Sequence, residues 1–261
     1  MDMLHIGLGA ISGMLVGFTL GLVGGGGSIL AVPLMVYLVG VKNPHIAIGT
    51  SAFAVAANAA IGLLNHGKAG NVNWRCGGLY AAAGIAGAIL GSSAGKAFNG
   101  QKLLFLFALI MVLVGVLMLR GRKNAGIPGA TCNRHNAPKV LGFGVGTGLF
   151  SGFFGIGGGF LIVPGLVGAT GMPILNAVGT SLVAVTAFGL TTALNYGRSG
   201  LVDWNLALVF IIGGIVGSTF GSRIARRLAG STGRLTTVFA ALIFVVAFYM
   251  IFRSLSTLFQ T

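Results

Sequence analysis

The sequence predicts an all-α polytopic membrane protein made of two inverted repeats. Of its 261 residues, 55% are hydrophobic and 7% are charged, and the mean hydropathy is +0.97. Roughly a quarter of the residues of an ordinary soluble domain are charged. The apolar residues form long runs rich in Gly and Ala, as in helical bundles, whereas barrel strands would alternate. The same order of runs and glycines occurs twice.

Ten apolar segments are predicted as helices, five in each repeat. Residues 1–120 form the first repeat, 121–139 a polar linker and 140–261 the second repeat. The segments run approximately over 4–23, 28–41, 47–64, 77–97, 103–119, 140–154, 160–171, 177–194, 206–220 and 235–252. The first segment lacks the basic region that precedes a secretory signal, so it is predicted to be a helix of the mature protein.

Polar residues support the duplication as strongly as hydropathy does. Gly49-Thr50-Ser51 matches Gly179-Thr180-Ser181 at an offset of 130 residues. At the same offset, 65–74 matches 195–204, with shared Asn, basic and Trp positions. Gly84, Gly87 and Gly91 then match Gly214, Gly217 and Gly221, and these six are predicted to be close-packing positions between helices. An internal repeat of this kind is typical of secondary transporters.

The second segment of each repeat is too short to cross a membrane. Residues 28–41 would rise about 21 Å as a helix, against a hydrocarbon core of roughly 30 Å. Each repeat is therefore predicted to hold a glycine-broken, re-entrant helix pair and three spanning helices. Irregular backbone at membrane depth must be buried in protein or line a cavity, which places both glycine breaks at the centre of the bundle.

The distribution of basic residues predicts that the repeats are inverted. If each repeat crosses an odd number of times, 11 of the 16 Lys and Arg lie on one side and 5 on the other. An even number gives 9 and 7. The positive-inside rule favours the first arrangement, with the linker in the cytoplasm and both termini outside.

Inversion brings the two breaks together near the midplane, where the N-termini of both short helices would favour a small anion. The predicted substrate-binding residues are Gly24, Gly25, Gly26, Gly27, Ser28, Thr50, Ser51, Asn58, Gly155, Gly157, Gly158, Gly159, Thr180 and Ser181. The alternative for the glycines is helix packing, and for the hydroxyls ordinary capping. Asn58 aligns with Phe188, so it is either an asymmetric ligand contact or an interhelical hydrogen bond.

The matched cations Lys68 and Arg198 would lie at opposite mouths. They could draw anions toward the cavity, and the alternative is interfacial snorkelling. The net charge is +14, and the basic residues lie between the apolar runs or at their ends. They are therefore interpreted as determinants of membrane topology and not as a nucleic-acid-binding surface. The predicted partners are a small anion and the lipid bilayer, and the sequence is compatible with a homo-oligomer.

Several chemistries find no support in the sequence. Asp2 and Asp203 are the only acidic residues, so no carboxylate lies deep in a span to relay protons. Cys76 and Cys132 lack metal-ligand spacing and are predicted to be ordinary small residues, neither a disulfide framework nor a zinc site. No nucleotide-binding or nucleophile motif is present. We expect no enzyme activity, no metal and no cofactor.

Two glycine-rich stretches resemble the TauE/SafE family, the sulfite exporters also called the 4-toluene sulfonate uptake permease family. They are 21–28 with Val32-Pro33 and 152–159 with Val163-Pro164, together with the two Gly-Thr-Ser triplets. The resemblance covers nearly the whole chain. It implies a secondary transporter of the inner or plasma membrane, with about eight spans, for sulfite, thiosulfate or sulfonates by alternating access. The copies differ where Ser28 stands opposite Gly159 and where Ile156 interrupts the second run. A passive anion channel and a non-transporting scaffold are the alternatives.

Overall fold

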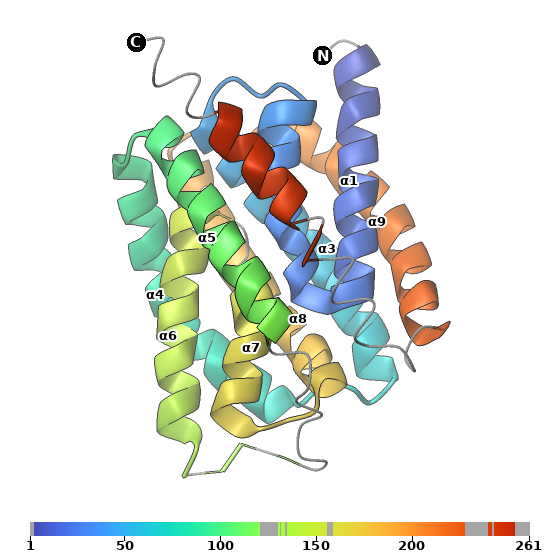
Figure 1. The fold of residues 1–261 in the computed structure, drawn as a ribbon, viewed down its shortest axis with the longest axis vertical. Helices are drawn as coiled ribbons and strands as arrows, with labels where there is room; N and C mark the ends of the chain where they lie inside the picture. Colours follow the sequence, from blue (N-terminus) through green and yellow to red (C-terminus); the bar gives the residue numbers. More distant parts are fainter. Residues whose placement is uncertain are drawn as a thin grey trace.

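The computed structural model describes residues 3–120, 130, 132–133, 135–155, 159–227, 240–241 and 243–253. Its elements are helices packed side by side into an elongated bundle (Figure 1). Six of them are long and apolar enough to cross a membrane, and these are α1, α3, α4, α5, α8 and α9. The predicted all-α polytopic class is confirmed.

The helices follow the predicted apolar segments with small changes at their ends. The first half contains α1 (Met3–Val23), η1 (Gly24–Leu30), α2 (Ala31–Pro33), η2 (Leu34–Leu38), α3 (Pro44–Lys68), α4 (Trp74–Ala97) and α5 (Gly100–Arg120). The second half contains α6 (Ala137–Phe154), α7 (Gly159–Thr170), α8 (Ile174–Gly197) and α9 (Trp204–Arg227), and residues 240–241 and 243–253 are also helical. Most of the predicted linker and the start of the segment predicted at 235–252 lie outside the described residues.

The two halves interlock through three helix pairs. α3 packs against α8 at the centre, α1 against α9 on one side, and α4 against α6 on the other (Figure 1). Each pair joins a helix of the first half to one of the second, so the core belongs to both halves. The two predicted repeats are therefore distinct stretches of sequence that share one packed core.

Glycines let the outer pairs approach closely at equivalent places. A Cβ added to Gly17 on α1 would lie 2.6 Å from Cα of Gly214 on α9, and one added to Gly148 on α6 would lie 2.7 Å from Cα of Gly84 on α4. Small residues allow such backbone contact in membrane helix pairs. The predicted packing role of Gly84 and Gly214 is confirmed. The inverted orientation of the halves in a membrane stays a prediction.

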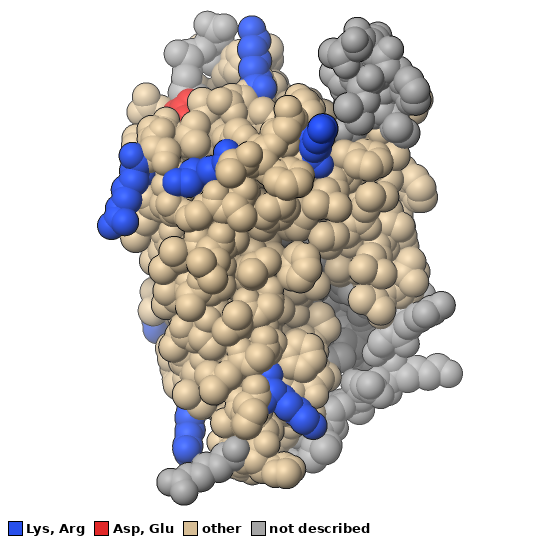
Figure 2. All heavy atoms as spheres, turned by 90° about the vertical axis from the view of Figure 1, so that its left-hand side faces the viewer, with Lys and Arg blue, Asp and Glu red and all other residues tan. Residues whose placement is uncertain are grey.

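Charged side chains lie toward the two ends of the bundle. Figure 2 shows Lys and Arg near both ends of one face, with an almost uncharged band between them. Of the residues that the structure describes, none of the buried polar side chains carries a charge. This distribution is what a protein with an apolar belt in lipid requires.

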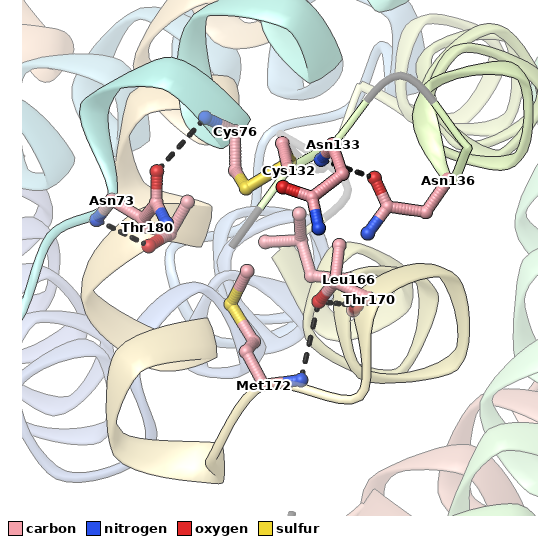
Figure 3. The surroundings of a disulfide bond; sticks show 9 residues. All are labelled: Asn73, Cys76, Cys132, Asn133, Asn136, Leu166, Thr170, Met172 and Thr180. Atoms are coloured by element: carbon pink, nitrogen blue, oxygen red, sulfur yellow. Dashed lines mark hydrogen bonds between the residues drawn. A yellow bond between two sulfur atoms is a disulfide. The ribbon is translucent and has the colours of Figure 1, made fainter. Parts of the chain in front are cut away.

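A disulfide joins Cys76, in the first turn of α4, to Cys132, in the segment before α6 (Figure 3). The Cα atoms are 5.3 Å apart, and both residues are buried. The prediction of two ordinary small residues is therefore wrong. The cysteines are 56 residues apart and meet only because α4 and α6 pack together, which their spacing in the chain does not reveal.

The disulfide and the basic residues give opposite indications of the compartment that faces the end of the bundle near Cys76 and Cys132. Disulfides persist in oxidising compartments and are rare in the cytosol. The positive-inside rule instead assigns the linker to the cytoplasm, and Arg75 and Lys139 are exposed close to the disulfide in sequence. The cytoplasmic position of the linker stays a prediction.

Candidate functional site

The two glycine breaks touch one another at the centre of the bundle. Gly24 and Gly155, which follow the last residues of α1 and α6, adopt φ values of 69° and 68°. This left-handed conformation suits glycine, because other residues meet a steric penalty there. A Cβ added to Gly25 would lie 2.7 Å from Cα of Gly159. The structure thus brings together the breaks that the sequence predicted to face each other.

The first break is more regular than predicted. Only Gly24 turns the chain, and a 3₁₀-helix begins at once, so the short helical segment starts at Gly24 and not at Ser28. Gly25, Gly26 and Gly27 are buried within it. Ser28 donates its hydroxyl proton to the Gly25 carbonyl oxygen at 2.9 Å.

The point between the breaks is filled by protein backbone. A Cβ on Gly159 would collide with the Gly25 carbonyl group, and one on Gly27 would collide with the backbone of α1 at Thr19 and Leu20. Gly25 and Gly159 are therefore in direct backbone contact, and an anion site formed by the two breaks stays a prediction. Gly157, Gly158 and Ile156 lie outside the described residues.

The predicted Thr residues tie the halves together through reciprocal hydrogen bonds. The N–H of Asp203 donates to Oγ1 of Thr50, and the N–H of Asn73 donates to Oγ1 of Thr180, both at 2.9 Å (Figure 3 shows the second bond). Asn73 and Asp203 also cap α4 and α9 with their side chains. Thr50 and Thr180 are buried in α3 and α8, where they hold the start of a neighbouring helix.

Ser51 and Ser181 direct their hydroxyl protons at their own helices. Ser51 donates to the Ile48 carbonyl at 3.0 Å, and Ser181 donates to the Val178 carbonyl at 2.7 Å. Neither residue caps its helix, because α3 and α8 begin earlier. They are buried beside Thr50 and Thr180, whose hydroxyls alone of the four bond to the start of another helix.

Asn58 is the predicted site residue with the most unusual environment. It lies in the middle of α3 and is 1% exposed. Neither Nδ2 nor Oδ1 has a hydrogen-bond partner among the described residues. A buried amide without partners costs about 1–3 kcal/mol, so a partner outside the described chain is expected.

Asn58 lines a small pocket between α1, α3, α8 and α9, close to the first break. The lining residues are Leu20, Gly21, Asn58, Gly62, Asn65, His66, Leu182, Ser218 and Ser222. Polar groups follow one face of α3 from buried Asn58 to exposed Asn65, opposite Ser218 and Ser222 on α9. The volume is about 10 Å³, which is room for about one water molecule. The structure therefore shows a narrow pocket.

The repeat-equivalent position is filled by an aromatic ring. Asn58 lies against Gly214, and its counterpart Phe188 lies against Gly84, the counterpart of Gly214. Phe188 is fully buried and stacks with Tyr80 at a centroid distance of 6.4 Å. The position that holds the unpartnered Asn58 amide in the first half thus holds the apolar ring of Phe188 in the second.

The counterpart of Asn65 in the second half belongs to a hydrogen-bond network. Asn195, the counterpart of Asn65, donates from Nδ2 to Oγ of Ser92 at 2.6 Å. Lys96 donates from Nζ to Oδ1 of Asn195 and to Oγ of Ser199, both at 2.9 Å. This Lys96 network joins the end of α4 to the end of α8.

Lys68 and Arg198 are both exposed, at the ends of α3 and α8. Lys68 lies two residues beyond His66, which lines the Asn58 pocket, and Arg198 follows α8 next to Ser199 of the Lys96 network. Neither reaches the pocket lining. Their predicted role as entrance cations stays a prediction.

Sequence reasoning missed four polar pocket residues, namely Asn65, His66, Ser218 and Ser222. Asn58 and Asn65 are separated by seven residues, and Ser218 and Ser222 by four, which puts each pair on one helix face. That spacing was a usable signal. What it could not show is that these faces of α3 and α9 oppose each other.

Comparison with known proteins identifies relatives along nearly the whole chain. The model of the family described as Sulfite exporter TauE/SafE matches residues 9–250. A "Probable membrane transporter protein" of Xylella fastidiosa (strain 9a5c) is 54% identical over 95% of both chains. The similarly named YunE of Bacillus subtilis (strain 168) is 27% identical, over 85% of this chain and 89% of its own. MJ0441 of Methanocaldococcus jannaschii is 26% identical over 91% and 94%. No solved structure matches the chain.

Proposed function

Because this chain belongs to the sulfite exporter TauE/SafE family, we propose that it is a secondary transporter of a small sulfur-containing anion, namely sulfite, thiosulfate or an organosulfonate. Family membership and six spanning helices make it a multi-pass membrane transporter of the inner or plasma membrane, and not an enzyme. The identity of the anion and the mechanism are the proposed parts.

The observation that carries the proposal is the free amide of Asn58. Its Nδ2 can donate two hydrogen bonds, and both are unused among the described residues. Ser218 and Ser222 line the same pocket but donate their hydroxyl protons to carbonyls of α9, and Lys68 lies two residues beyond the lining residue His66. Donors in a site shielded from water bind an oxyanion well, because hydrogen bonds to charged groups are the stronger ones.

The contrast between the two sides supports alternating access. At the Asn58 position there is a narrow polar pocket, whereas at the equivalent position Phe188 packs against Gly84 and the Lys96 network joins α4 to α8. The contact between Gly25 and Gly159 lies between them, where glycine backbones can shift without side-chain clashes. In our proposal the halves rock about this contact, which widens one side as the other closes.

Counterflow in proteoliposomes that contain the purified full chain tests the proposal. We expect saturable uptake of labelled sulfite or an alkyl sulfonate, accelerated by the same anion trapped inside. Asn58→Leu should remove most of the uptake, and Gly78→Leu is the matched control, because a Cβ at Gly78 meets nothing within 4 Å. Uptake that does not saturate would identify a channel. If the protein neither transports nor binds the anions, it is a scaffold.

A further inference from the structure

The interior of the molecule offers hydrogen bonds without charge. The buried polar side chains of the described residues are Ser, Thr and Asn. The pocket lining adds Asn65 and His66, and among the described residues it includes no Lys, Arg, Asp or Glu. A ligand at Asn58 would therefore meet chiefly the unused amide donors, with no fixed counter-charge beside it among the described residues.

Such a pocket discriminates between anions by their charge. The cost of moving an ion out of water grows with the square of its charge, while the interaction with neutral donors grows only in proportion to it. A site binds a dianion when a cation in it offsets the desolvation free energy of the dianion, as Arg and Lys do in phosphate sites. The Asn58 pocket lacks that compensation.

We infer that the pocket, when it is widened by the proposed rocking of the halves, takes singly charged sulfur oxyanions, namely hydrogensulfite or an organosulfonate, and rejects dianions such as sulfite itself, thiosulfate and sulfate. The inference rests on the proposed function and narrows its substrate class. Asn58 is the specificity-determining residue, because its amide is the deepest donor without a partner.

Two exposed basic residues follow lining residues of the pocket in the chain. Lys68 follows the pocket residues of α3, Arg223 follows Ser222 on α9, and both are exposed. Their field concentrates anions at the mouth but is screened by water and salt. His66 is the titratable residue of the lining. A protonated His66 would favour anions of any charge, so its effect must be separated from the protonation of the substrate.

Binding to purified protein, followed by thermal shift and calorimetry, tests the inference. Methanesulfonate is a monoanion at every working pH, thiosulfate and sulfate are dianions, and sulfite gains a proton near neutral pH. We expect methanesulfonate to bind at least about tenfold more tightly than the dianions, a difference of about 1.4 kcal/mol. Sulfite should bind more weakly as pH rises, while methanesulfonate binding to His66→Gln should stay constant.

A charge added to the pocket should reverse the preference. Ser222 donates its hydroxyl proton to the Thr219 carbonyl of its own helix at 3.1 Å, so its replacement removes little from the packing. Ser222→Lys should bring thiosulfate at least to the affinity of methanesulfonate. Ser222→Met has a similar length without charge and should keep the monoanion preference.

The outcomes separate the inference from the proposed function. If the unmodified protein binds thiosulfate or sulfate as tightly as methanesulfonate, or if sulfite binding is unchanged by pH, the monoanion inference is wrong and the transporter proposal stands. If no sulfur oxyanion binds or is transported at any pH, both fail. A preference that Ser222→Lys removes and Ser222→Met retains supports the inference.

Discussion

The Asn58 pocket and the Phe188 site are equivalent places in the two halves, yet one is open and the other is filled. Both lie against a glycine of a neighbouring helix, Gly214 or Gly84. At one place a buried amide has no partner among the described residues, and at the other a ring stacks on Tyr80. The backbone plan is shared, and the side chains differ.

This difference shows how a duplicated chain can separate framework from specificity. Thr50 and Thr180 make the same hydrogen bond in both halves, so they belong to the framework. Asn58 and Phe188 depart from equivalence where a ligand could be bound. Substitutions at equivalent framework positions should have matching effects, whereas those at the divergent positions should not.

The largest effect is expected where the halves touch. Gly25→Val should abolish transport, because even its Cβ would lie 2.7 Å from Cα of Gly159 and the breaks would be forced apart. Counterflow and the apparent Tm in detergent measure the result. Gly78→Val is the control, with open space around the added side chain. Full activity in Gly25→Val would show that the contact between the breaks is dispensable.

Asn58→Phe should be the next most damaging change. It copies the side chain that the other half already accommodates against Gly84, so the protein should still fold. Loss of a hydrogen bond to a charged ligand costs about 1.5–3 kcal/mol, which is roughly 10- to 150-fold in affinity. Titration of the ligand and the apparent Tm separate binding from folding.

Phe188→Leu is the matched control for Asn58→Phe. It shortens an apolar side chain at the equivalent position without adding a polar group, so ligand affinity should change much less. Equal losses in the two variants would mean that general packing, and not the amide, determines binding.

Thr50→Val and Thr180→Val should lower the stability of the protein by similar amounts. Each removes the acceptor of one helix-starting N–H, that of Asp203 or Asn73, which should cost about 1–3 kcal/mol of folding free energy. Equal decreases in apparent Tm would support a shared framework. A large loss of ligand affinity in one variant alone would give that hydroxyl a binding role instead.

Most of the framework could be predicted from the sequence. Apolar runs determine the helices, and the short runs beside Gly24 and Gly155 correctly indicated chain breaks that meet. Thr50 and Thr180 align in the two repeats of the sequence, and they make equivalent hydrogen bonds in the structure. These features depend on the local pattern and on repetition.

The site could be predicted only in part, because it depends on which helix faces lie opposite each other. Asn58 and Ser218 are 160 residues apart and share a pocket only because α3 packs on α9. The close backbone contact between Gly25 and Gly159 could not be predicted, because the sequence gives no interhelical distance. The disulfide was missed for the same reason.

Breaking the Lys96 network should have a smaller effect than altering Asn58. Lys96→Met removes the ammonium group that holds Asn195 and Ser199, while most of the length of the side chain is kept. We expect a change of a few-fold in counterflow rate and little change in binding, because Lys96 lies outside the pocket lining. Lys102→Met, at an exposed position of α5, is the control.

The smallest effect is expected from the disulfide, which tests the membrane orientation of both sites. If the linker is cytoplasmic, as the basic residues predict, Cys76 and Cys132 are mainly thiols in growing cells. Cells quenched in acid and labelled with a heavy maleimide should then show two modified cysteines in the unfolded protein, and Cys76→Ser with Cys132→Ser should transport normally. Labelling only after reduction would place this end outside the cytoplasm. The Asn58 pocket, whose mouth lies at the end of α3 just before the loop to α4, would then open outward instead of inward.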